Sequence, residues 1–94
     1  MADKSKAGEK YRHADHVSWR KVENEAVVLD LNTSDYFSLN ETGLVVWEKL
    51  GEGADLHGLA EAVCAEYDVD EKQAMADAKK LVGELLKKKL IQPA

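Results

Sequence analysis

The first half of the chain alternates hydrophobic and polar residues with the two-residue period of β-strands. β-Branched and aromatic residues between positions 16 and 39 are interrupted twice by polar clusters, a pattern that predicts a three-stranded meander. The predicted strands are residues 17–22, 26–31 and 36–39, and the predicted turns are residues 23–25 and 32–35. In the second strand Val27, Leu29 and Leu31 share one face, and we expect that face to meet the core.

The second half repeats hydrophobic residues every three to four positions, which is the spacing of amphipathic helices. Asn40, Asp55 and Asp70 each precede such a stretch, and each side chain can accept a hydrogen bond from the first helical turn. We therefore expect three helices after these caps, the first ending near residue 50 and the third near residue 89. The predicted fold is α+β, with the element order βββααα.

Length and composition indicate a single small domain and disfavour a catalytic function. The 94 residues are 45% hydrophobic and 33% charged, which is typical of an ordered chain with one modest core and little room for a deep active site. We assign residues 16–94 to this domain and residues 1–15 to a flexible N-terminal tail. The formal net charge of −5 opposes the phosphate attraction on which nucleic-acid binding depends, so we expect no nucleic-acid partner.

Residues that could carry chemistry are few. The one cysteine, Cys64, cannot form an internal disulfide, and no local base would activate it as a nucleophile. The histidines at positions 13, 16 and 57 form no metal-binding motif with it, so we expect no metal, no cofactor and no catalytic residue. No hydrophobic run approaches the roughly 18 residues that cross a membrane. These features predict a cytoplasmic protein without a membrane partner.

The third predicted helix has more hydrophobic surface than docking requires. Four residues on one side are sufficient to dock it: Ala74, Ala78, Leu81 and Leu85. Three others widen the hydrophobic arc to about 140°, and a lysine stands at its margin: Met75, Val82, Leu86 and Lys79. Either the core wraps around this helix, or the wider arc lines a groove for a partner.

The third predicted strand is an edge of the meander and offers unpaired backbone N–H and C=O groups. Tyr36 and Phe37 are successive residues, so their side chains point to opposite faces of the sheet. One of them could simply be a half-exposed aromatic residue. Alternatively, an extended peptide could add to this edge through backbone hydrogen bonds and place side chains between the strand and the third helix.

A family resemblance is carried by three segments: VLDL at residues 28–31, YFSLNETG at 36–43 and VWEKL at 46–50. Together they resemble the PqqD family of small peptide-binding proteins, and Gly53 stands where that pattern expects a glycine. Residues 59–70 and 85–91 are similar to the second and third helices of the family. The resemblance covers about residues 16–92.

The resemblance implies a winged-helix-like fold of three strands and three helices, called a RiPP precursor recognition element. Such proteins are not enzymes: they bind the leader segment of a ribosomally synthesised precursor peptide and present it to a modifying enzyme. In PQQ biosynthesis that enzyme is a radical S-adenosylmethionine protein, and related members serve lasso-peptide and other pathways. Carried onto this chain, the implied peptide-binding residues are Tyr36, Phe37, Ser38, Leu39, Met75, Lys79, Val82 and Leu86.

A DNA-binding winged-helix module that uses the third helix is the alternative function. The helix would begin with Asp70, Glu71, Lys72 and Gln73. Two acids at the end that should meet base edges and phosphates argue against DNA binding.

Overall fold

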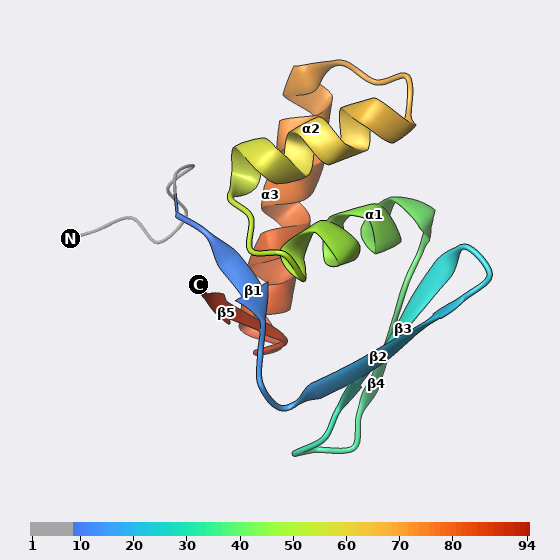
Figure 1. Cartoon of the computed structure of the whole chain (residues 1–94), viewed down its shortest axis with the longest axis vertical. Helices are drawn as coiled ribbons and strands as arrows, with labels where there is room; N and C mark the ends of the chain where they lie inside the picture. Colours follow the sequence, from blue (N-terminus) through green and yellow to red (C-terminus); the bar gives the residue numbers. More distant parts are fainter. Residues whose placement is uncertain (1–8) are drawn as a thin grey trace.

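The computed structural model describes residues 9–94, which form five strands and three helices (Figure 1). The strands are β1 (Tyr11–His13), β2 (Val17–Val22), β3 (Glu25–Asp30), β4 (Tyr36–Leu39) and β5 (Ile91–Pro93). The helices are α1 (Glu41–Leu50), α2 (Leu56–Glu66) and α3 (Glu71–Lys87). The three helices follow one another between β4 and β5, so strands and helices are segregated along the chain. The fold is therefore α+β, as expected.

The predicted meander is present as an antiparallel sheet with the strand order β2-β3-β4. Its register pairs Val28 with Trp19 on one side and with Phe37 on the other. The turn between β3 and β4 is held by Asp30, whose carboxylate accepts hydrogen bonds from the backbone N–H groups of Asn32 and Thr33 at 2.8 and 3.2 Å. These local bonds explain why the polar cluster after β3 forms the predicted turn.

A second, two-stranded sheet was not predicted. It adds a strand before the meander and a strand after the helices, so the predicted order βββααα is incomplete and part of the predicted tail is structured. β1 pairs antiparallel with β5, so the two ends of the described chain meet (Figure 1). Tyr11 is 1% exposed and belongs to the core, whereas residues 1–15 were expected to be a flexible tail. Residues 1–8 of that prediction lie outside the described residues. Strands of three residues are too short to show a period, which is why the pattern missed them.

The three helices begin where their caps predict. Asn40, Asp55 and Asp70 each accept a hydrogen bond from the backbone N–H three residues later, at 2.9, 2.8 and 2.8 Å. α1 ends at Leu50 as expected, but α3 ends at Lys87 rather than near residue 89. Lys89 adopts a φ of +62°, and Leu90 N–H returns to the carbonyl of Leu85 at 2.9 Å, which terminates the helix in a Schellman motif.

The three-stranded sheet buries the face of β3 opposite to the predicted one. All three helices lie on one side of this sheet (Figure 1), and α1 packs against β3. Ala26 and Val28 are 0% exposed on that side, whereas Leu31 is 57% exposed on the other. Large side chains on the neighbouring strands, Trp19 and Phe37, flank Val28 and pack against the core, so small residues fill the middle of the inner face.

Candidate functional site

The three-stranded sheet has two edges of different chemistry. β2 carries Arg20 and Lys21, and charged residues of this kind discourage another strand from pairing with an edge. β4 carries no charged residue. Among the described residues, the backbone of Tyr36–Leu39 makes no hydrogen bond outside its ladder with β3. β4 is therefore the edge that is open to an added strand.

Two adjoining hollows run between β4 and α3. One has a volume of about 300 Å³ and is lined by Tyr36, Phe37, Ser38, Leu39, Leu81, Glu84, Leu85, Lys88 and Leu90. The other, of about 480 Å³, is lined by Ser38, Leu39, Asn40, Thr42, Gly43, Asp77, Lys80, Leu81 and Glu84. Because they share Ser38, Leu39, Leu81 and Glu84, they form one groove, which we call the β4–α3 groove.

The β4–α3 groove combines a hydrophobic floor with a charged rim. Hydrophobic side chains come from both walls, including Phe37 from β4 and Leu81 from α3. The rim residues on α3 and its C-cap alternate in sign along one side of the helix: Asp77, Lys80, Glu84 and Lys88. The Lys88 Nζ lies 5.5 Å from the centroid of the Phe37 ring, a cation–π distance that holds the ammonium at the mouth of the groove.

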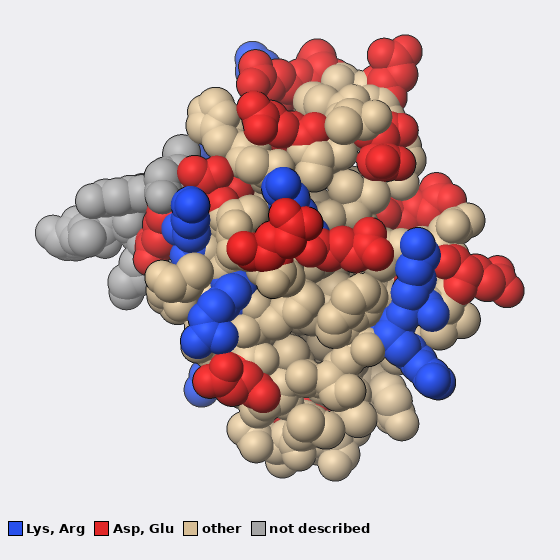
Figure 2. Space-filling view, viewed as in Figure 1, with Lys and Arg blue, Asp and Glu red and all other residues tan. Residues whose placement is uncertain are grey.

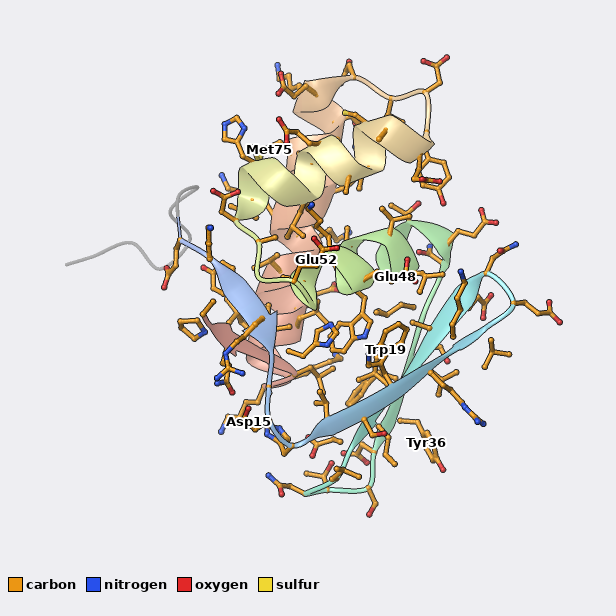
Figure 3. The ribbon with its side chains drawn as sticks, in the orientation of Figure 1. Asp15, Trp19, Tyr36, Glu48, Glu52 and Met75 are labelled. Carbon is orange, nitrogen blue, oxygen red and sulfur yellow. The ribbon has the colours of Figure 1, made fainter. Side chains whose placement is uncertain are left out.

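Tyr36 and Phe37 point to opposite faces of the sheet, as expected. Phe37 is half-buried against the core. Tyr36 is 71% exposed and points away from the helices (Figure 3). An added strand would therefore meet Phe37 on the inner face and Tyr36 on the outer face.

The comparisons with known proteins agree with this arrangement. A model of the family described as coenzyme PQQ synthesis protein D (PqqD) matches residues 25–91. The chain belongs to the PqqD family. A comparison with curated proteins gives no significant match to this PqqD-family chain.

Two solved structures are similar to this PqqD-family chain, and both hold leader peptides. The structure of TbiB1 in complex with the TbiA(beta) leader peptide is 32% identical, with a TM-score of 0.80, over 86% of this chain and 94% of that chain. Lasso peptide synthetase B1 complexed with the leader peptide is 25% identical, with a TM-score of 0.78, over 88% and 98% of the two chains.

Four of the eight predicted site residues lie on α3 but not in the β4–α3 groove: Met75, Lys79, Val82 and Leu86. Val82 is 4% exposed and belongs to the hydrophobic core, so it offers almost no surface to a peptide in this structure. Met75 lies near α2, far from β4 (Figure 3). At about 100° per residue these four positions are about 160° around α3 from the groove positions.

The packing of α2 on α3 explains why these four residues do not border β4. The wide hydrophobic arc supplies core residues such as Ala78 and Val82. Leu81, which we expected only to dock the helix, instead faces β4 across the groove. The row of charges at residues 77, 80, 84 and 88 could have marked the solvent side of α3, but nothing in the sequence shows that this side borders β4.

His13 has a structural position in this PqqD-family chain rather than a place in a tail. Its ring stacks on Trp47 with the centroids 3.8 Å apart, and its Nε2 donates a hydrogen bond to the Trp47 carbonyl at 2.8 Å. Burial lowers the pKa of His13 below its ordinary value of 6.5, and this hydrogen bond opposes part of the shift.

The described residues offer no cluster of metal ligands. No group of three His, Cys, Asp or Glu residues in this part of the chain could hold a metal ion. Within the same residues, no helix has both the length and the hydrophobicity to span a membrane. The β4–α3 groove is therefore the candidate functional site.

Proposed function

We propose that this chain is a non-catalytic adaptor that binds the leader segment of a ribosomally synthesised precursor peptide and presents it to a modifying enzyme. The observation that carries the proposal is the uncharged, unpaired β4 edge beside the hydrophobic β4–α3 groove. Similar structures have been solved with leader peptides, which supports the same assignment. A cytoplasmic location would suit a protein that meets a newly made peptide.

In the proposed complex the leader adds to Tyr36–Leu39 as a fourth strand of the sheet. Backbone hydrogen bonds to β4 provide affinity that depends little on sequence. Every second leader side chain points into the β4–α3 groove, where Phe37 and Leu81 accept hydrophobic groups and the charged rim selects polar ones. The proposed peptide-binding residues are Tyr36, Phe37, Ser38, Leu39, Leu81, Glu84 and Lys88.

The adaptor would act through proximity. When the adaptor holds the leader beside a modifying enzyme, the core peptide is tethered near the active site of that enzyme. This raises the effective concentration of the core peptide at the active site. In a PQQ pathway the partner would be a radical S-adenosylmethionine enzyme, and in a lasso pathway another maturation enzyme. Both pathways use the same leader site in this proposal.

The winged-helix-like arrangement does not favour DNA binding in this chain. The exposed start of α3 carries Asp70 as its N-cap and Glu71 in its first turn, and Asp77 follows about two turns after Asp70. These acids would repel phosphates at the surface that a recognition helix presents.

The test is a titration of the protein with the synthetic TbiA(beta) leader peptide, followed by amide chemical shifts. We expect saturable binding with the largest shifts in Tyr36–Leu39 and on the groove side of α3, at residues such as Leu81 and Lys88. Shifts confined to β2, or to the Met75 and Leu86 side of α3, would contradict the proposed site.

A further inference from the structure

The four charged residues at the rim of the β4–α3 groove have no ionic partner within the protein. Asp77, Lys80, Glu84 and Lys88 are all exposed. None of them forms an ion pair with another described residue, although Glu84 has a lysine one helical turn away on either side. Alternating charges on a helix surface usually pair with one another. Unpaired ones beside an open strand edge are available to a bound peptide.

The spacing of the rim charges matches the spacing of side chains on a strand. Because an α-helix rises about 1.5 Å per residue, Lys80, Glu84 and Lys88 follow one another at intervals of about 6 Å. Side chains on one face of a β-strand are two residues, or about 6.7 Å, apart. β4 and α3 run alongside each other, since Asn40 borders the hollow with Lys80 and Tyr36 borders the hollow with Lys88. A strand added to β4 would therefore place successive inward-facing side chains opposite successive rim charges.

Long charged side chains suit both layers of the groove. Phe37 and Leu81 contribute to a hydrophobic floor, whereas the charges stand at the rim. A long side chain can cover hydrophobic surface with its methylene groups while its charged end stays in water. Lys88 already approaches this arrangement, with its Nζ 5.5 Å from the centroid of the Phe37 ring.

The alternation of charge at the rim differs from the charge on α1 and α2. Between residues 40 and 69 there are seven acids and one lysine, and acidic side chains gather over α1 and α2 (Figure 2). A surface of one sign attracts any partner of the opposite sign. Alternating signs instead favour one order of charges and oppose the inverted order, which provides specificity.

We propose that Lys80, Glu84 and Lys88 are specificity-determining residues, which select a leader segment with the order acid, base, acid at alternate, inward-facing positions. The central basic side chain pairs with Glu84, and the two carboxylates pair with Lys80 and Lys88. The order of charges also fixes the register of the leader, because a shift by two residues brings like charges together. This inference rests on the proposed adaptor function and adds the class of leader sequence that the chain accepts.

The test is competition with a fluorescently labelled TbiA(beta) leader peptide, measured by fluorescence anisotropy. The competitors are synthetic strand peptides whose three alternate positions carry Glu-Lys-Glu, Lys-Glu-Lys or Glu-Gln-Glu, with threonine at the positions between them. The proteins are the wild type, Glu84→Gln and the inverted variant Lys80→Glu/Glu84→Lys/Lys88→Glu. Lys72→Glu is the matched control, because it changes the net charge by the same amount as the inverted variant but lies on α3 outside the groove. Thermal melts confirm that each variant is folded.

We expect the Glu-Lys-Glu peptide to bind the wild type and Lys72→Glu about tenfold more tightly than the Lys-Glu-Lys peptide, and the inverted variant to reverse this order. Glu84→Gln should abolish the preference for the Glu-Lys-Glu peptide over the Glu-Gln-Glu peptide. High salt should reduce the wild-type preference.

The same order of affinities in the wild type and the inverted variant would overturn the inference, as would an absence of any difference between the peptides. Either result would leave the adaptor function intact as long as the labelled leader binds. If the labelled leader fails to bind the wild type, the proposed function is refuted, and the inference with it.

Discussion

Replacement of Leu81 by alanine tests which side of α3 faces the leader. Leu81 lines both hollows of the β4–α3 groove and is half-buried in the free protein. Complete burial of a leucine side chain contributes about 1.5–3 kcal/mol. Because part of Leu81 is already buried, a bound peptide gains about 1 kcal/mol from covering the rest, which corresponds to about a fivefold change in Kd.

We expect Leu81→Glu to be more severe than Leu81→Ala. It places a carboxylate among hydrophobic groups and three residues from Glu84, on the same side of the helix. The loss should be about 2 kcal/mol or more, or about thirtyfold in Kd. The assay is isothermal titration calorimetry with the TbiA(beta) leader peptide, and thermal melts confirm that each variant is folded.

Leu86→Ala is the matched control for Leu81→Ala. It removes the same side chain from the same helix at another half-buried position, but Leu86 does not line the β4–α3 groove. Leu86→Ala should destabilise the fold while leaving leader affinity within twofold of wild type. If Leu86→Ala weakens binding and Leu81→Ala does not, the groove lies on the side of α3 that the sequence pattern favoured, and the structural assignment is refuted.

Three further predictions concern the fold around the site. Val82→Glu buries an unpaired charge at a position that is 4% exposed, so urea denaturation should show a loss of about 3 kcal/mol or more; a fully stable variant would show that Val82 is not in the core. Tyr11→Ala should cost about 3 kcal/mol in the same assay, whereas a residue in a loose tail would cost almost nothing. The pKa of His13, followed by NMR, should lie below 6.5 in the folded protein. Because the unfolded chain binds this proton more readily than the folded chain, the free energy of unfolding should rise with pH between the lowered folded-state pKa and 6.5. A His13→Gln variant should lose this pH dependence.

Elements whose signals are local could be predicted from the sequence. The caps at Asn40, Asp55 and Asp70 act within one helical turn, so the residue types alone indicate where the helices begin. The edge strand Tyr36–Leu39 was also predicted at its observed bounds, because polar turn residues and a helix cap flank it.

Features that depend on tertiary packing could not be predicted. Period-two alternation gives β3 two faces but does not say which one the helices cover, and the face with Ala26 and Val28 is covered because Trp19 and Phe37 supply bulk beside it. β1 and β5 are short and far apart in the chain, so only their pairing reveals them. Likewise, α3 has hydrophobic residues on two sides. The sequence does not show that α2 covers one of these sides and that the other therefore faces β4.

The central claim is that the leader becomes the fourth strand of the sheet, paired with β4. It is tested most directly by nuclear Overhauser effects between the Hα protons of a labelled TbiA(beta) leader peptide and the backbone protons of Tyr36–Leu39 in the complex. We expect a ladder of cross-strand effects along β4, together with contacts from alternate leader side chains to Phe37 and Leu81. A bound peptide that shows its backbone contacts at β2, or along α3 without any contact to the backbone of β4, would contradict the account.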